Sequence, residues 1–154
     1  MAENNTNAPL IETSAVGFTY QGSETPALQD VTLSIGAGEC VLLCGKSGCG
    51  KTTVVCAVLQ ALVNRGLRVA SFKCGPDYID PMFHESVIGT DSHNLDGYFC
   101  DGKMLRRLLA DNSAGADVSV IEGVMGFYDG VNGKASSHAV SREVDCPAVI
   151  VVDC

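Results

Sequence analysis

The sequence predicts an α/β fold in which a mainly parallel sheet is flanked by helices. Three observations predict it. Apolar segments of strand length alternate with segments of helical periodicity, several strand segments are apolar on both faces, and 46% of the 154 residues are hydrophobic. Strands that are apolar on both faces are typical of parallel sheets covered by helices on each side. A chain of this length and composition buries one substantial core.

The N-terminal part of the sequence predicts a tail followed by three β segments. The polar residues 1–8 are expected to form a disordered tail. Leu10–Tyr20 and Val31–Ile35 have the composition of strands and are separated by a polar turn. A second turn, Gly36–Glu39, then leads into the apolar strand Cys40–Cys44.

The middle of the sequence predicts a helix, a strand and a loop. The helix runs from Thr52 to about Arg65, because apolar residues recur on one face and Gly66 provides a C-terminal stop. Arg68–Lys73 is the next predicted strand. Cys74–Pro81 contains two prolines and is predicted to be a loop.

The C-terminal part continues the alternation of helices and strands. A helix is expected over Lys103–Asp111, and the apolar strand Asp117–Glu122 follows it. The remaining predicted elements are the glycine-rich loop Gly123–Gly133, the helix Ala135–Val144, and the apolar strand Ala148–Val152, which ends at Asp153.

A phosphate-binding motif stands between the strand Cys40–Cys44 and the helix that follows it. The segment Gly45–Thr52 fits the pattern G-x-x-x-x-G-K-[ST]. In this setting, backbone N–H groups bind the α- and β-phosphates, Lys51 reaches the β- and γ-phosphates, and Thr52 offers its hydroxyl to Mg²⁺. We therefore predict a P-loop NTPase fold. The predicted nucleotide-binding residues are Gly45, Lys46, Ser47, Gly48, Cys49, Gly50, Lys51, Thr52 and Thr53.

Acidic residues follow the ends of two further predicted strands. Asp77 and Asp80 come after Arg68–Lys73, whereas Glu122 ends a second strand and Asp129 lies seven residues beyond it. The carboxyl ends of parallel strands meet at one edge of a sheet, so these acids can converge on the phosphate loop. Mg²⁺ bound to a nucleotide takes a loop hydroxyl, one or two carboxylates and waters as ligands. Glu122 occupies the place of a Walker-B-type acid.

Composition and charge narrow the class of partner. The formal net charge of −8 argues against nucleic acid, and apolar stretches of membrane-spanning length are lacking. The polar start has neither the basic nor the apolar region of a signal peptide, so a cytoplasmic location is expected. The eight cysteines contain no C-x-x-C pair and are expected to be reduced thiols, most of them buried.

Three blocks resemble cobyrinate a,c-diamide synthase. They are Phe72–Pro81 (FKCGPDYIDP) with His84, Asn94–Asp96 (NLD), and Val120–Gly130 (VIEGVMGFYDG). The similarity extends in order and spacing from about Gly45 to Asp153. It covers about 100 residues, and the two longer blocks have an unusual composition.

The resemblance implies a glutamine-dependent amidoligase of corrin biosynthesis. ATP would activate a corrin acetate carboxylate as an acyl phosphate, and glutamine-derived ammonia would form the amide. By this analogy Asp77, Asp80 and Asp129, with Lys73, serve the reaction, while Thr52, Asp77 and Glu122 are candidate metal ligands. The family takes its ammonia from a C-terminal glutaminase domain, which this sequence lacks. We therefore expect the 154-residue chain to be an incomplete synthetase that is marginally folded and inactive in isolation.

The N-terminal segment, about residues 10–53, instead resembles the start of ABC-transporter ATP-binding proteins of the cobalt- and vitamin-importing kind. It shares Phe18–Tyr20 and Pro26–Ile35 with them, together with the phosphate loop. The resemblance implies an antiparallel β segment and places Tyr20 against adenine, although an aromatic residue on a half-buried strand is an alternative. After Thr53 it ends, because the L-S-G-G-Q signature is absent. An ABC transporter subunit is the alternative function.

The predicted organisation is therefore a tail (1–9), an ABC-like β segment (10–44) and a synthetase-like nucleotide-binding domain (45–154). Lys46 occupies the place of the second lysine in deviant Walker loops, where that lysine reaches a partner's nucleotide. This position raises a third alternative, a partitioning-type ATPase that acts as a homodimer. A solvated loop lysine is the simpler interpretation.

Overall fold

Seven strands and five helical segments form the part of the chain described by a computed structural model, namely residues 9–19, 24–26, 28–131 and 134–152. The strands are β1 Ile11–Phe18, β2 Leu28–Ile35, β3 Cys40–Cys44, β4 Val69–Cys74, β5 Asp91–Leu95, β6 Val118–Glu122 and β7 Ala148–Ile150. The helices are α1 Lys51–Asn64, α2 Ile79–Phe83, α3 Gly102–Asn112 and α4 Ser137–Glu143, with a π-helical segment η1 over His84–Ile88.

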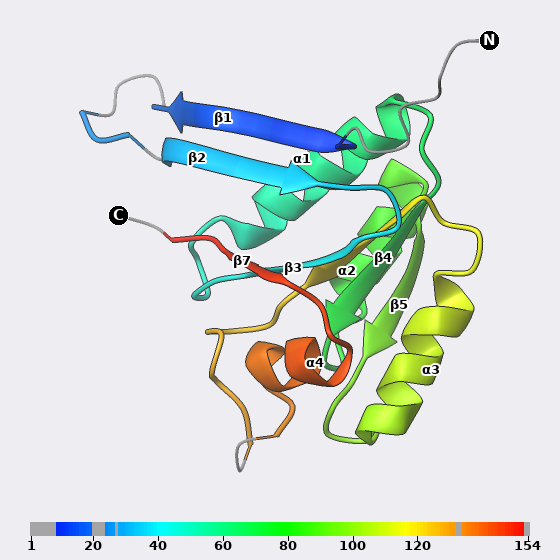
Figure 1. The fold of residues 1–154 in the computed structure, drawn as a ribbon. Coiled ribbons are helices and arrows are strands. Elements are labelled where there is room, and N and C mark those ends of the chain that lie inside the picture. Colours follow the sequence, from blue (N-terminus) through cyan, green and yellow to red (C-terminus); the bar gives the residue numbers. More distant parts are fainter. Residues whose placement is uncertain (1–8, 20–23, 27, 132–133, 153–154) are drawn as a thin grey trace, which may run out of the picture.

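A five-stranded parallel sheet is the centre of the fold, with strand order β5-β4-β6-β3-β7 (Figure 1). Helices connect successive parallel strands, as a parallel sheet requires. The predicted parallel α/β architecture is confirmed. In register, Glu122 of β6 lies beside Leu43 of β3 on one side and Lys73 of β4 on the other. The ends of these three strands therefore meet at one edge.

Helices cover both faces of the sheet (Figure 1). Val55, Leu59 and Leu62 of α1 pack on one face, in a core shared with Val41 and Val120. Phe72, Leu95 and Ile121 point to the opposite face, where Leu105 of α3 and Val140 of α4 cover them. Burial on both faces explains the continuous apolar sequence of β3, and in β4 and β6 even the polar side chains are buried.

Strands β1 and β2 form a separate antiparallel hairpin that lies alongside α1 (Figure 1). Leu10, Ile11 and Leu33 pack against the same core as α1, which attaches the hairpin to the domain. The expected antiparallel segment is therefore present. Strand β2 begins at Leu28, three residues earlier than predicted, because its backbone pairs with the end of β1.

Three elements between residues 74 and 95 were not predicted from the sequence, namely α2, η1 and β5. The segment Cys74–Pro81 is not wholly a loop, since β4 includes Cys74 and α2 begins at Ile79. Pro81 fits because the first turn of a helix needs no N–H donor at that point. Strand β5 (DSHNL) has no apolar alternation and escaped prediction. It forms because each of its residues pairs with β4, which offers a free edge.

Other boundaries agree within a few residues. Helix α4 is shorter than predicted, because the Ser136 side chain caps it by accepting the N–H of Ala139. Strand β7 ends at Ile150, not at Val152. Within the described ranges, none of the helices is both long and apolar enough to cross a membrane. The seven cysteines in those ranges are free thiols.

Candidate nucleotide and carboxylate site

The loop between β3 and α1 has the backbone that phosphate binding needs. Gly48 and Gly50 have φ of 88° and 80°, a left-handed conformation that strains other residues. Gly50 is the N-cap of α1 and supplies no side chain to accept the first helical N–H groups. These donors and the helix dipole are free to bind an anion. Gly45 has no room for a side chain, because an added Cβ would lie 2.7 Å from Cys49 Sγ.

A cleft of about 450 Å³ lies against this loop. The loop that follows β6 and the chain that follows β7 form its other walls. The lining residues are Gly45, Lys46, Ser47, Gly48, Cys49, Gly126, Phe127, Ile150, Val151 and Val152.

Glu122 connects the phosphate loop to the sheet edge. Its side chain is fully buried, and its Oε1 accepts a hydrogen bond from the Thr52 hydroxyl at 2.6 Å. The Lys51 ammonium lies 3.5 Å from the same oxygen. Because Thr52 lies in the first turn of α1 and Glu122 ends β6, this contact joins the two elements where the predicted phosphates and metal would lie.

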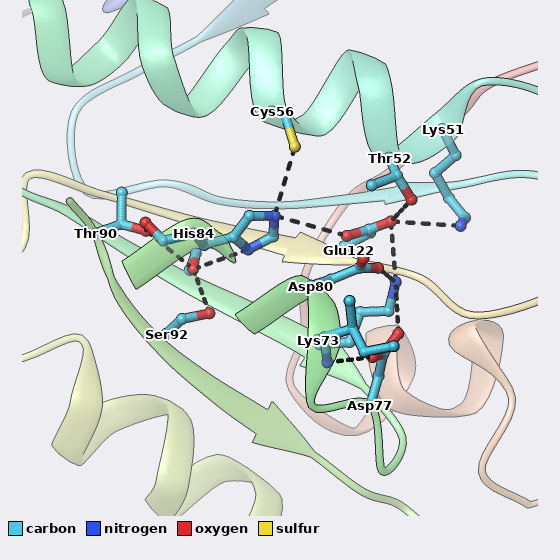
Figure 2. A network of polar contacts seen from close by, with 12 residues as sticks. Lys51, Thr52, Cys56, Lys73, Asp77, Asp80, His84, Thr90, Ser92 and Glu122 are labelled. Carbon is cyan, nitrogen blue, oxygen red and sulfur yellow. Dashed lines mark hydrogen bonds and ion pairs between the residues drawn. The ribbon is translucent and has the colours of Figure 1, made fainter. Parts of the chain in front are cut away.

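Lys73 is the hub of a carboxylate cluster, which we define as Lys73, Asp77, Asp80 and Glu122 (Figure 2). Its ammonium lies 3.0 Å from Glu122 Oε1, 2.5 Å from Asp80 Oδ2 and 3.5 Å from Asp77 Oδ2. Lys73 is only 3% exposed. A cation this deeply buried is held by its partners, so the cluster is a built feature of the fold.

The turn after β4 brings the two aspartates to Lys73. Asp77 Oδ1 accepts the backbone N–H of Ile79 at 3.0 Å, which folds the chain into the start of α2. Asp80 is then in the first turn of α2 and faces the lysine. The neighbouring side chains Tyr78 and Ile79 are largely exposed.

Charge compensation keeps Lys73 and Asp77 ionised. Burial alone would lower the pKa of Lys73, but hydrogen bonds and charges from Asp80 and Glu122 outweigh it and raise that pKa above its ordinary value. Burial raises the pKa of Asp77, but the hydrogen bond from the Ile79 N–H and the charge of Lys73 lower it by more. The pKa of Asp77 therefore lies below its ordinary value. The site therefore combines a fixed cation at Lys73 with an Asp77 carboxylate that is charged at neutral pH.

A second group of polar residues lies behind Glu122 and was not assigned a role from the sequence (Figure 2). His84 is buried, with Nε2 4.0 Å from Glu122 Oε2 and 3.8 Å from Cys56 Sγ. Burial lowers the pKa of His84 below its ordinary value, although Glu122 and Asp80 oppose that shift. In the sequence, His84 stands out only through its place beside a block that resembles the synthase family. Its partners Cys56 and Glu122 are distant in sequence, so no local pattern indicates this contact.

Several predicted residues lie outside these contacts. Asp129 is exposed, and its Oδ2 accepts the N–H of Gly126 within its own loop at 2.9 Å. That loop borders the cleft, but the contacts described do not join Asp129 to Lys73. Lys46 and Thr53 are exposed at the phosphate loop. Tyr20, predicted to stack on adenine, and Asp153 are outside the described residues.

The residues present fit the predicted Mg²⁺. The Thr52 hydroxyl and the Glu122 carboxylate stand together beside Lys51, and both offer oxygen, the donor that Mg²⁺ prefers. Glu122 Oε2 is buried and has no hydrogen-bond partner among the described residues. An ion here would supply positive charge beside the phosphates, and Thr52 and Glu122 would hold it.

The family is decided by the match of a family model. The model described as the CobQ/CobB/MinD/ParA nucleotide binding domain matches residues 40–144. The chain belongs to this family. Within the CobQ/CobB/MinD/ParA family, curated relatives include hydrogenobyrinate a,c-diamide synthase from Rhodobacter capsulatus, 47% identical over 112 residues. Cobyrinate a,c-diamide synthase from Salmonella typhimurium is 43% identical over 110 residues.

These alignments cover 70% of the chain in both cases, but only 26% and 24% of the two relatives. The chain thus spans about a quarter of the length of the curated relatives it matches. The family match begins at Cys40 and does not include β1 and β2. The resemblance of that hairpin to ABC-transporter proteins therefore stays a prediction.

Two solved structures share this fold. The signal recognition particle receptor FtsY from Elizabethkingia anophelis has a TM-score of 0.53 at 16% identity, over 74% of this chain and 41% of its own. The 54 kDa signal recognition particle protein from Aeropyrum pernix has a TM-score of 0.52 at 22% identity, over 73% and 28%. At these identities the likeness shows the P-loop NTPase fold alone.

Replacing Glu122 with glutamine is expected to weaken Mg²⁺-dependent nucleotide binding about 10–100-fold, because the substitution removes a buried charge beside Thr52. Nucleotide affinity measured over a series of Mg²⁺ concentrations checks this. Glu85→Gln, an exposed carboxylate on η1, is the matched control. An unchanged Mg²⁺ dependence in Glu122→Gln would remove this residue from the site.

Proposed function

We propose that this chain is the ATP-binding segment of an amidoligase of corrin biosynthesis. The observation that carries the proposal is the carboxylate cluster around Lys73, placed directly beside the phosphate loop through Glu122. Nucleotide binding alone requires the loop and one acid. The cluster sets Lys73 against three carboxylates, so an anionic reactant would bind here together with the positive charge of Lys51 and Mg²⁺, and the names of the relatives support a corrin carboxylate.

The proposed reaction has two steps. A carboxylate oxygen of the substrate attacks the γ-phosphorus of ATP, the bond to ADP breaks, and an acyl phosphate forms. Ammonia then attacks the acyl carbon, and inorganic phosphate leaves with the carbon–oxygen bond electrons, giving the amide after loss of a proton. Such chemistry depends mainly on positioning and charge stabilisation.

The chain's own residues have distinct roles in this proposal. Lys51 neutralises charge on the β- and γ-phosphates, and Lys73 neutralises charge where carboxylate and phosphate meet. Asp77 and Asp80 hold Lys73 in place and orient the incoming carboxylate through it. Thr52 and Glu122 hold Mg²⁺, which supplies electrostatic stabilisation of the phosphates when bound. Asp129 would join the site from the loop beside the cleft.

The whole protein's substrates and setting belong to the same proposal. We infer a cobyrinate-type corrinoid as substrate and glutamine as the ammonia source through a separate glutaminase domain. A cytoplasmic location and the division into residues 1–9, 10–44 and 45–154 are further parts of it, whereas a homodimer through Lys46 belongs to the partitioning-type alternative. Each rests on sequence pattern or resemblance.

An isotope-transfer experiment tests the proposed function. The full-length amidoligase that carries this segment is incubated with Mg²⁺, ATP, ammonium and a cobyrinate whose carboxylates carry heavy oxygen. Transfer of one heavy oxygen into inorganic phosphate is expected, because the acyl phosphate passes that atom to the leaving group. Corrinoid-dependent ATP hydrolysis should accompany it. ATP hydrolysis unaffected by the corrinoid, with unlabelled phosphate, would overturn the proposal and favour the transporter or partitioning alternatives.

A further inference from the structure

Two cysteine thiols meet at the start of the β3–β7 strand pair, far from the carboxylate cluster in sequence. Cys40 begins β3, and Cys146 precedes β7 by two residues. Leu42 is paired with Ala148, so the register of the two strands places Cys40 opposite Cys146. Their Sγ atoms lie 3.3 Å apart, although the two residues are 106 positions apart in the sequence. Both are free thiols.

The geometry of this pair meets the requirements of a disulfide. Neighbouring strands lie about 4.7–4.9 Å apart, and disulfides join Cα atoms that are about 4.4–6.8 Å apart. Both side chains contact the core that α4 covers, so they point to the same face of the sheet. Closing the gap from 3.3 Å to a bond of about 2.05 Å needs a movement of about 1.3 Å, which small rotations of the two side chains provide.

The two thiols differ in their access to solvent. Cys40 is partly exposed, whereas Cys146 is buried at 7% exposure. Cys146 Sγ lies 2.9 Å from the Cys40 carbonyl oxygen, which keeps this side chain against the start of β3. The neighbouring Cys40 thiol and burial together raise the pKa of the Cys146 thiol above its ordinary value. Cys40 is therefore the thiol that an oxidant from solvent reaches first.

Strand β7 leads into one wall of the phosphate-loop cleft, beside β3 (Figure 1). β7 has three residues and lies at the edge of the sheet, with Ala148 and Ile150 exposed. Strands with few buried contacts and exposed hydrogen bonds open most readily. The chain after β7 lies directly against the loop, since an added Cβ at Gly45 would be 2.3 Å from the Val151 carbonyl oxygen. The position of β7 thus determines that wall.

We propose that Cys40 and Cys146 form a reversible disulfide under oxidising conditions, which ties β7 to β3 and holds this wall of the cleft in place. The bond would join the two strands at the end opposite to the phosphate loop, where it blocks no ligand. The inference does not depend on the proposed corrin chemistry, because it concerns the attachment of β7 and not the reaction.

The oxidant in this proposal is a small-molecule disulfide, for which oxidised glutathione is the probe. The Cys40 thiolate attacks one glutathione sulfur, a mixed disulfide forms, and the other glutathione leaves as a thiolate. The Cys146 thiolate then attacks Cys40 Sγ, and the second glutathione leaves. Two protein thiols are oxidised and one glutathione disulfide is reduced to two thiols, which take up the two protons that the cysteines lost.

The test equilibrates the native chain with glutathione buffers of graded reducing strength, quenches it with acid and identifies linked peptides by mass spectrometry. A peptide that joins Cys40 to Cys146 is expected. The same titration in denaturant is the reference, because the unfolded chain must close the loop between residues 106 positions apart. The equilibrium constant for this link should therefore be at least about tenfold larger in the native chain.

The attachment of β7 has readouts of its own. Amide hydrogen exchange in residues 147–152 should slow about tenfold in the oxidised chain, because β7 can no longer separate from β3 at its start. By thermodynamic linkage, a tenfold preference of the native chain for the disulfide raises the melting temperature by about 3–6 °C.

Three variants are the controls. Cys40→Ser and Cys146→Ser each remove one sulfur, so neither hydrogen exchange nor melting temperature should respond to the oxidant. Cys146 is buried, and Cys146→Ala replaces the serine variant if the hydroxyl prevents folding. Cys100→Ser alters another partly buried cysteine that packs on the same core and should form the link as the native chain does.

Each other outcome contradicts a stated part of the proposal. Lack of the Cys40–Cys146 peptide in the folded chain, or a mixture of pairings equal to that in denaturant, would overturn the disulfide. A link between two molecules, seen as a covalent dimer, would overturn it as well. The expected disulfide with unchanged exchange in residues 147–152 would overturn its role in holding the wall of the cleft.

Discussion

Replacing Lys73 with methionine is expected to lower the free energy of unfolding by about 3 kcal/mol and to abolish carboxylate activation. Methionine fills a similar volume but leaves Glu122 and Asp80 facing each other without the buried cation. Breaking one partner of a buried ion cluster costs several kcal/mol, because the remaining charges have lost their solvent and their counter-ion. Denaturant titration at neutral pH measures the change.

The control for this prediction is Lys103→Met, which removes an exposed lysine at the start of α3 and should leave stability within about 0.5 kcal/mol. The double variant Lys73→Met with Glu122→Gln should recover part of the loss, since both partners are then neutral. A loss below about 1 kcal/mol for Lys73→Met would mean that the carboxylates are satisfied without it.

Replacing Lys51 with alanine is expected to raise the dissociation constant of ATP about 100-fold. Lys51 is nearly buried at the start of α1 and lies where the motif directs it to the β- and γ-phosphates. Loss of charge-assisted hydrogen bonds to phosphate is worth about 1.5–3 kcal/mol. Equilibrium titration with a fluorescent ATP analogue checks the affinity.

Lys46→Ala is the matched control in the same loop. Lys46 is exposed, and its simpler interpretation is a lysine that contacts solvent and not the nucleotide. Its affinity should stay within about threefold of the native value. A loss as large as that of Lys51→Ala would instead support the deviant Walker loop and a homodimer. Unchanged binding in Lys51→Ala would remove the phosphate loop from nucleotide binding altogether.

Elements that depend on interactions between neighbouring residues were predicted well. The phosphate loop and α1 form where the motif places them, because glycine conformation, strand end and helix start are decided within about ten neighbouring residues. The strands β3, β4 and β6 follow from their apolar composition. Their shared edge follows from the rule that parallel strands end on the same side.

Predictions were weaker where a contact joins distant segments. Strand β5 is polar and exists only because β4 offers it a hydrogen-bonding edge. Asp129 was grouped with the other acids, yet its described contacts lie within its own loop. The place of Lys73 between three carboxylates depends on the register of β4 against β6, which the sequence does not state.

By itself, the sequence determined the parallel α/β fold, the phosphate loop and the acids at the strand ends, since periodicity and short motifs depend on neighbours along the chain. Only the tertiary structure decided which acids meet Lys73, and that His84 stands behind Glu122. The physical reason is that burial and charge pairing arise between elements. Glu122 meets Thr52 across 70 residues and His84 across 38, and no local pattern encodes either distance.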